Sequence, residues 1–414
     1  MKPICVLYPV NADFPSSQAG AIQVVHTARA LAALGCRVYL LLRRASLQSA
    51  LPALRFYDLT PHPNLRVVQI PVIRLPGAGL SEKISNFSFY PLCMLISFFL
   101  VLLGKVDIIY VRLETRRVYW FFRMLRDVFK KKLVFEAHQV LFAQLQGGEV
   151  APPVDAAKLK PAARQAYFQE RSICETADGI VFITSAMREC ARQFHTLKQP
   201  TCVIHDASRF ASADKPRVND DKHVVYCGRL AANRGVDILI EAMALTPPDV
   251  RLTVVGGSSE SRGRSDCGDE RRTLEKMVAE LGLAERVAFA GPVPPGAVRS
   301  YLDKASVLAI PMRADTQTRL SSPLKLFEYM ASGKPIVAAA LDGVMEILRH
   351  EENALLFEPD NPRDLANQLN RLLASKDLQA KLARQALEDA AAHTWEKRAD
   401  QALRFLRSVI CVAA

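Results

Sequence analysis

The segment VVYCGRLAANRGVDILIEA, residues 224–242, decides the fold. Its first residues form an apolar run that predicts a buried strand, and Gly228 permits a sharp turn after that strand. Arg229 and Arg234 follow, and Gly235 opens an amphipathic helix. A strand, a short turn and a helix in this order make the first half of a βαβ unit. Two guanidinium groups beside a helix N-terminus also suit a diphosphate, although two solvent-exposed arginines in a loop would give the same pattern.

The same alternation extends through the rest of the chain. In the first half, strands are expected at 4–8, 37–42, 66–70, 107–111, 132–136, 179–183 and 201–204. After a polar stretch at 206–222, further strands are expected near 223–227, 251–255, 286–290, 306–310, 335–339 and 354–357. Two such series, each with helices between its strands, predict an α/β protein with two Rossmann-like, doubly wound parallel sheets.

The domain boundaries follow from this alternation. We expect one domain over residues 1–210, a second over 211–393, and a C-terminal helix over 394–414 that docks back towards the first domain. Ligands of doubly wound sheets bind at the carboxyl ends of the strands, so a central cleft between the two domains is expected.

Composition and charge narrow the class of protein. Half of the 414 residues are hydrophobic, which is typical of a globular chain and excludes disorder. Residues 1–210 carry 26 Lys and Arg against 14 Asp and Glu, whereas residues 211–414 carry 28 of each kind. The net charge of +12 therefore belongs to the first half. This asymmetry indicates an anionic partner or, equally, a solubilising surface.

The cysteines and the N-terminal residues indicate the cellular compartment of the protein. There are nine cysteines, no two of them are three residues apart, and several lie in apolar runs. This usage is typical of reduced thiols in a reducing cytosol. The opening residues MKPICVLYP do not resemble a signal peptide. We therefore expect a cytoplasmic protein.

The most apolar stretch is FSFYPLCMLISFFLVLL, residues 87–103. It falls short of the roughly 20 residues that a membrane span needs, and it contains Pro91. These features favour a helix that packs on a sheet or lies at a membrane interface.

The basic charge is densest in RRVYWFFRMLRDVFKKK, residues 116–132. On a helix, one side holds Arg116, Arg123, Arg126 and Lys130, and Trp120 and Met124 lie at a flank. The other side holds Val118, Phe121, Phe122, Leu125, Val128 and Phe129. An ordinary helix that covers the sheet explains the apolar side, and the basic side would still be able to meet lipid headgroups. Residues 87–132 thus predict an anionic membrane surface as a partner. Nucleic acid is less favoured, because the aromatic side chains do not alternate with the cations.

A second segment, RLSSPLKLFEYMASGKPIVAA at 319–339, also points to a phosphate. Ser321 or Ser322 is expected to cap a helix with Pro323 in its first turn. Lys325 then lies in that first turn, where the helix dipole disfavours a cation unless an anion binds nearby. Glu328 follows one turn later, where it would either accept hydrogen bonds from sugar hydroxyls or face solvent as an ordinary helix residue.

These segments together resemble a known family. The runs GRL…RGVDILIEA, RVAFAGPVP, SSPLKLFEYMASGKPIVAA and DGVMEILRHEENALLFEPDNPRDLANQL look like the donor half of retaining GT-B glycosyltransferases of family 4, the glycosyl transferases group 1. The first half resembles the same family more weakly, through Gly20 before the first helix, AHQ at 137–139 and ERSICETADGIVFITSAMRE at 170–189.

The resemblance implies roles for particular residues. Arg229 matches the arginine on the donor diphosphate, and Arg234 stands where the family usually has lysine. Glu328 matches the glutamate that holds the nucleotide ribose. His138 matches a histidine near the reacting sugar, and Gly20 matches a loop where the backbone approaches the donor phosphates or the acceptor.

One departure stands out. Leu320 occupies the position of the first glutamate of the Glu-x7-Glu motif, which contacts the donor sugar in the family. Pro323 has no N–H to offer a phosphate, whereas Leu324 and Lys325 keep theirs. The donor sugar is contacted differently, or its partner is Asp315 or Arg319, or activity is lost; the coherent remainder of the site favours the first reading.

The resemblance implies a glycosyltransferase that moves a sugar from a nucleotide-diphosphate sugar to a glycan, lipid-linked or other hydroxyl acceptor, with retention. No D-x-D triplet occurs, so neither a metal nor another cofactor is expected. We expect a role in polysaccharide biosynthesis, with the protein peripheral on the inner membrane face. The alternatives are a nucleotide-sugar isomerase (epimerase) of the same fold and a non-catalytic nucleotide-binding scaffold.

Overall fold

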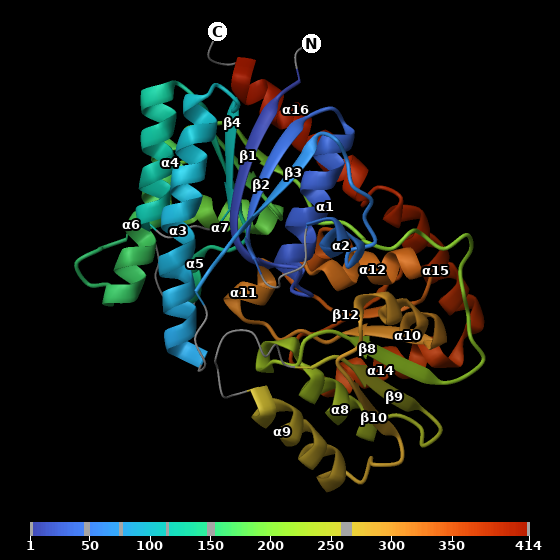
Figure 1. The fold of residues 1–414 in the computed structure, drawn as a ribbon. Helices are drawn as coiled ribbons and strands as arrows, with labels where there is room; N and C mark the ends of the chain where they lie inside the picture. The colour runs from blue at the N-terminus through green and yellow to red at the C-terminus, as the bar shows by residue number, and fades with distance from the viewer. Residues whose placement is uncertain are drawn as a thin grey trace. The chain divides into compact units, whose positions relative to one another are not determined.

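The computed structural model describes residues 3–44, 50–73, 78–112, 116–146, 154–257 and 267–411, which form two compact units (Figure 1). Unit 1 contains Met1–His205 together with Trp395–Ala414, and unit 2 contains Asp206–Thr394. Unit 2 thus begins five residues before the predicted boundary at 211. The C-terminal helix α16 (Trp395–Cys411) belongs to unit 1.

Unit 1 is built on a parallel sheet of seven strands in the order β3-β2-β1-β4-β5-β6-β7. The strands are β1 (Cys5–Phe14), β2 (Arg37–Arg44), β3 (Leu65–Ile70), β4 (Ile108–Arg112), β5 (Lys132–Ala137), β6 (Gly179–Phe182) and β7 (Thr201–Val203). The chain starts at the middle of the sheet, runs outward to β3 and then returns to build the other half. This reversal between β1 and β4 is the mark of a doubly wound sheet.

Helices cover the sheet of unit 1. In chain order they are α1 (Ala19–Ala33), α2 (Ala50–Arg55), α3 (Ala78–Leu102), α4 (Arg116–Phe129), α5 (Leu141–Gln146), α6 (Pro161–Thr176) and α7 (Ser185–Phe194). Figure 1 shows α16, in red, beside the blue α1, against which it packs, and α3 beside α4. The first and the last helix of the sequence therefore pack together in one unit.

Unit 2 repeats the design with six parallel strands in the order β10-β9-β8-β11-β12-β13. They are β8 (His223–Cys227), β9 (Arg251–Val255), β10 (Val287–Gly291), β11 (Val307–Ile310), β12 (Ile336–Ala339) and β13 (Leu355–Phe357). The helices are α8 (Val236–Ala244), α9 (Cys267–Glu280), α10 (Val298–Lys304), α11 (Thr316–Arg319), α12 (Leu324–Ser332), α13 (Asp342–Met345), α14 (Pro362–Ala374) and α15 (Lys376–Ala390). The reversal lies between β8 and β11.

The strand sequences explain why both sheets are parallel. Every residue of β6, β11 and β12 is buried, because helices cover both faces of the sheet. The prediction of two Rossmann-like, doubly wound sheets is confirmed. The cleft between the two domains stays a prediction.

Helices α3 and α4 match the expectations for residues 87–132 in part, and α3 contacts β1 and β3 of the sheet. The apolar window Ile84–Leu102 of α3 is long and apolar enough to cross a membrane, yet only 28% of it is buried, so it is not a buried core helix. On α4, Val118, Phe122 and Leu125 are buried as predicted, but Val128 is 64% exposed. Arg126 donates to the backbone oxygen of Thr176 at 2.6 Å instead of facing solvent. The side chain of Arg116 lies outside the described residues.

Candidate active site

The strand order locates the candidate ligand-binding edge of each unit. In doubly wound sheets ligands bind beyond the carboxyl ends of the strands at the point where the winding reverses. In unit 1 this point lies after β1 and β4, and in unit 2 after β8 and β11. The predicted residues Gly20 and Arg229 follow β1 and β8 along the chain.

Lys325 is the centre of the unit 2 site. It lies in the first turn of α12, and its ammonium nitrogen sits 3.9 Å from the centre of the Tyr226 ring. A side chain at Gly228 would come within 2.4 Å of that nitrogen, so only glycine leaves room for it. Within the described part of the chain, the buried Lys325 Nζ has no hydrogen-bond partner. Burial, and next the charge of Arg234, lower the pKa of Lys325 to about 7.

The loop after β8 brings the two arginines to the same edge. Arg229 is exposed, and its backbone oxygen accepts a hydrogen bond from Tyr226 at 2.8 Å. Arg234 is partly covered, and burial lowers its pKa. Gly235 has φ +67°, and a side chain there would meet the Pro311 oxygen at 1.7 Å. This glycine allows the loop to turn into α8 against the strand end at β11.

The predicted caps of α12 are wrong. Pro323 occupies the N-cap position itself, and its side chain makes no capping hydrogen bond. Ser321 instead donates to the Thr318 backbone oxygen at 2.9 Å, because the short helix α11 ends immediately before it. The hydroxyl of Ser322 is buried without a hydrogen-bond partner among the described residues. The N-terminus of α12, which begins at Leu324, therefore keeps uncapped backbone donors, and an anion would satisfy them.

Glu328 is buried and already engaged by a cation. Its carboxylate lies 2.7 Å from Nε of Arg209, which belongs to the polar stretch 206–222. Burial raises the pKa of Glu328, and the charge of Arg209 opposes that rise. A ribose at Glu328 would have to share the carboxylate with Arg209.

The surroundings of Leu320 bear on which residue contacts the donor sugar in place of the missing glutamate. Leu320 is buried at the end of α11. Asp315 is used as the cap of the same helix, where its carboxylate accepts from the Thr318 N–H at 2.7 Å. Arg319 is about half exposed and lies 4.0 Å from Asp342. Because the Asp315 carboxylate already caps α11, it is a poorer candidate for contact with the donor sugar.

In unit 1, His138 lies immediately after β5 and is held by Glu136. Its Nε2 is 2.7 Å from the Glu136 carboxylate, which is completely buried. Burial and the nearby charge of Arg112 lower the pKa of His138 to about 4, although Glu136 opposes this. The imidazole is therefore neutral near pH 7.

Gly20 joins the same network through its backbone. The sequence had suggested that Gly20 lies in a loop before the first helix, but it lies in the first turn of α1. Its oxygen accepts from Arg112 at 2.9 Å, and Arg112 also donates to Gln23 at 2.9 Å. Gln23 in turn donates to Glu136 at 2.6 Å. One chain of hydrogen bonds thus connects Gly20 with His138.

Sequence reasoning missed several of these residues. Glu136 was visible as a charged residue inside the apolar strand run KLVFEA, which is a usable signal because central parallel strands are buried on both faces. Arg209 and Arg398 gave no comparable signal, since each stands in a polar segment far along the chain from its partner.

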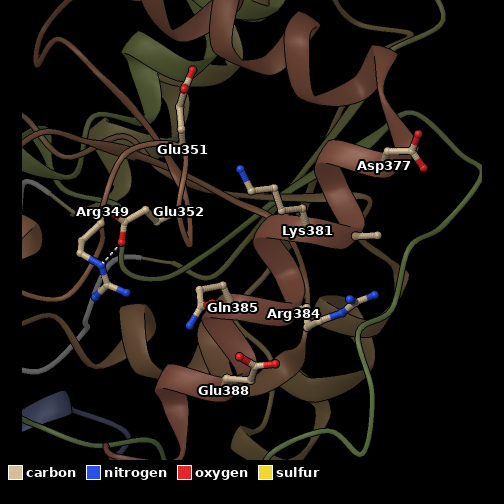
Figure 2. Close-up of a pocket in the computed structure, with 9 residues that line it drawn as sticks. Arg349, Glu351, Glu352, Asp377, Lys381, Arg384, Gln385 and Glu388 are labelled. Carbon is tan, nitrogen blue, oxygen red and sulfur yellow. Dashed lines mark hydrogen bonds and ion pairs between the residues drawn. The ribbon is translucent and has the colours of Figure 1, made fainter.

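A surface depression in unit 2 is distinct from this site. It has a volume of about 630 Å³ and is lined by residues of 349–352 and α15 (Figure 2). Four acidic side chains and three basic ones line it, among them the paired Arg349 and Glu352. None of the predicted site residues borders it. The described residues also contain no group of three or more His, Cys, Asp or Glu side chains able to hold a metal ion.

The comparisons with known proteins match both units. Residues 19–207 match the glycosyl transferase 4-like domain, and residues 208–389 match the family described as glycosyl transferases group 1. Each half of the chain thus matches a family model of glycosyltransferases. These two domains correspond to units 1 and 2 and account for nearly the whole chain.

Curated relatives match part of the chain. The D-inositol 3-phosphate glycosyltransferase of Acidothermus cellulolyticus is 32% identical over 194 residues, which is 45% of this chain and 41% of that protein. The corresponding protein of Corynebacterium urealyticum is 31% identical over 194 residues, which is 45% of this chain and 43% of that protein. The chain thus aligns with less than half the length of these relatives.

Solved structures confirm the fold over nearly the whole chain. Sucrose-phosphate synthase of Thermosynechococcus elongatus superposes with a TM-score of 0.75 at 22% identity and covers 98% of this chain and 99% of its own. Anabaena HepE in complex with UDP gives a TM-score of 0.69 at 19% identity, over 98% and 100% of the two chains. At such identities the similarity shows the GT-B fold and nothing more.

Proposed function

We propose that the protein transfers a sugar from a nucleoside diphosphate sugar to a hydroxyl acceptor, and that the donor diphosphate binds at Lys325, Arg229 and Arg234. The observation that carries the proposal is the buried ammonium group of Lys325 at the start of α12, for which the described residues supply no hydrogen-bond partner. A buried cation without a partner is costly, and a bound anion would stabilise it. The choice of donor is supported by the matches of both units to glycosyltransferase family models.

In the proposed reaction the bond between the sugar and the diphosphate breaks, and its electron pair stays on the diphosphate oxygen. The acceptor oxygen forms the new bond to the sugar, and its proton passes to the departing diphosphate. Lys325, Arg229 and Arg234 stabilise the negative charge that accumulates on the leaving group, which is the main electrostatic contribution to such a step. We further propose net retention at the sugar carbon, with the anomeric configuration of the product as the test.

The test is a panel of nucleoside diphosphate sugars, with each donor incubated with and without candidate acceptors. UDP sugars come first, because HepE, which shares the fold, was solved with UDP. Transfer to an acceptor, or slow donor hydrolysis without one, supports a glycosyltransferase. Epimerised donor would identify an isomerase, and binding without turnover would identify a scaffold.

For the acceptor we propose a lipid-linked or polymeric glycan at the cytoplasmic face of a membrane, approached through an outer face of unit 1. This outer face consists of exposed apolar side chains on two neighbouring helices, α3 and α4, which contact each other through Phe98 and Phe129 at 5.9 Å. Its members are Leu92, Leu95, Phe99, Leu102, Trp120, Met124 and Val128.

Cations accompany this outer face. Arg123 lies 4.9 Å from the Trp120 ring, and Lys105 and Lys130 are exposed at the ends of the two helices. Apolar side chains next to cations fit the boundary between acyl chains and anionic headgroups. This combination favours a lipid surface over a purely polar partner.

Vesicle cosedimentation tests the outer face. Charge reversal at Arg123 and Lys130 should weaken binding to vesicles containing anionic lipid, and Trp120→Ser should weaken it further. Arg126 is left unchanged because it holds Thr176 and Asp178 inside the unit. Donor affinity should not change in these variants. Equal binding of the wild-type protein to anionic and neutral vesicles would contradict the proposed role of the cations.

A further inference from the structure

Arg398 of the C-terminal helix α16 is buried in the network around His138. One of its guanidinium nitrogens lies 2.6 Å from the Glu136 carboxylate, and another donates to the Thr27 hydroxyl at 3.0 Å. Arg398 and Glu136 are both almost completely inaccessible to solvent. Their partnership spans 262 positions of sequence, so it exists only because α16 returns to pack on α1.

Glu136 is surrounded by donors. Gln23 donates to it at 2.6 Å, Arg398 at 2.6 Å, and the Tyr110 hydroxyl through a short hydrogen bond. His138 Nε2 is the fourth neighbour, at 2.7 Å. An ionised carboxylate can only accept hydrogen bonds, so the His138 nitrogen that faces it must carry the proton. In a neutral imidazole the other nitrogen, Nδ1, then bears a lone pair.

The ionised state of Glu136 depends on Arg398. Burial alone would raise the pKa of Glu136, but Arg398 is the strongest of the opposing influences, followed by His138, and together they hold it well below its ordinary value. Arg112 also faces the pair and acts in the same direction. Without the charge of Arg398, the buried carboxyl group would tend to take up a proton and become a donor. Its proton would then face His138 Nε2, which favours the tautomer protonated at Nδ1.

We propose that Arg398 is a positioning residue: through Glu136 it holds His138 in the tautomer protonated at Nε2, so that Nδ1 presents a lone pair to a hydroxyl group of the substrate. The inference rests on the proposed glycosyl transfer and on the match of His138 to a histidine near the reacting sugar. It gives the C-terminal helix a role in the reaction beyond completing the fold of unit 1. A lone pair on a fixed nitrogen orients a sugar hydroxyl without acting as a base.

Nitrogen NMR of the ligand-free protein labelled in its histidines tests the proposal. The chain has eight histidines, so the resonances of His138 are identifiable by their loss in His138→Asn. In the wild type, Nδ1 of His138 should show the shift of an unprotonated nitrogen and Nε2 that of a protonated one. Arg398→Met should exchange these two shifts, and Arg398→Lys, which keeps the charge, should largely preserve them.

Arg404→Met is the matched control on the same helix. Arg404 is exposed and, among the residues that the structure describes, forms an ion pair with Asp400 one turn away, so the His138 resonances should stay unchanged. If Arg398→Met does not fold, Arg398→Gln, which can still reach Thr27, takes its place. Unchanged His138 shifts in a folded, charge-neutral variant would overturn the proposal.

The activity readout separates this proposal from the proposed function. With a donor in hand, kcat of Arg398→Met should fall by about tenfold, the value of one good hydrogen bond, with KM little changed. A loss of activity without any change of tautomer would mean a merely structural role and would refute the positioning of His138. If Arg398→Met changes the tautomer but the wild-type protein turns over no donor, the positioning of His138 by Arg398 and Glu136 stands. That result would refute the proposed glycosyl transfer instead.

Discussion

Lys325 in unit 2 and Glu136 in unit 1 are both buried ionisable groups at the carboxyl edge of a parallel sheet, yet their surroundings are opposite. Glu136 is enclosed by four donors, whereas no hydrogen-bond partner of Lys325 Nζ occurs among the described residues. A buried group whose hydrogen bonds are all formed is held in one position, whereas a buried charge without hydrogen bonds would be stabilised by a bound ligand. From this comparison we infer that unit 2 binds the ligand, while the polar network of unit 1 orients a side chain.

The largest expected effect lies on the binding side of this comparison. Arg229→Ala and Lys325→Met should each lower turnover by about 100- to 1000-fold, because each removes a cation from the leaving diphosphate. Arg229→Ala should leave the melting temperature nearly unchanged, since the side chain is exposed. Near-normal turnover in Arg229→Ala would remove that residue from the site.

The second effect is a pH dependence of donor affinity. Lys325 has a pKa of about 7 in the free protein, and a bound diphosphate would raise it towards the ordinary value for lysine. Binding then takes up a proton above pH 7, so Kd should be flat below pH 7 and rise by up to about tenfold per pH unit above it. Calorimetry in buffers of different ionisation enthalpy measures the proton directly.

The design of that titration matters. A nucleotide sugar serves better than a free nucleoside diphosphate, whose terminal phosphate itself titrates near neutral pH. Lys325→Arg should bind with no rise between pH 7 and 9. A wild-type protein whose affinity is equal at pH 6 and 9 would show that Lys325 does not contact the anion.

A third prediction concerns the loop that carries the arginines. Gly235 and Gly282 both have φ +67°, but only Gly235 is crowded, by the Pro311 oxygen. Gly282→Ala should cost about 1–2 kcal/mol of unfolding free energy from the backbone conformation alone. Gly235→Ala should cost clearly more, because a backbone segment must also move. If denaturant titrations gave the same loss of unfolding free energy for both variants, a side chain at position 235 would fit without displacing the Pro311 backbone.

The smallest expected effect is that of chelation. We propose that the cations of unit 2 neutralise the diphosphate without a bound metal, so excess EDTA should leave turnover within a factor of about two. A loss of activity that Mg²⁺ or Mn²⁺ restores would contradict this part of the account.

The two sites also differ in how far the sequence predicted them. In unit 2 the residues lie within short segments, and the spacing of Lys325 and Glu328 on one helix was readable directly. The fold was equally readable, because the alternation of buried strands and helices is a local pattern. The prediction that failed was the cap of α12. Ser321 bonds instead to the end of α11, a four-residue helix that the sequence pattern did not indicate, and Ser322 caps neither helix.

In unit 1 the decisive contacts are long-range. His138 was found through its position after a strand. Arg398, which pairs with the Glu136 that holds His138, stands 262 residues after Glu136 on a helix that looks like an ordinary amphipathic one. Nothing in the local pattern indicates which of its charges turns inward. The same limit explains Arg126 and Val128 on α4, whose orientations differ from the predicted helix faces because neighbouring elements decide them.

The most direct test of the central claim is calorimetric titration of a nucleoside diphosphate sugar into three proteins: the wild type, Lys325→Met and Lys334→Met. Lys334 is the matched control, because it is also a buried lysine near α12 but donates to Asn219 at 2.9 Å. We predict that Lys325→Met weakens binding by about 10- to 100-fold, the loss of one charged hydrogen bond, while Lys334→Met binds as the wild type does. Equal affinity of the wild type and Lys325→Met would contradict the claim that the unpartnered lysine marks the donor site.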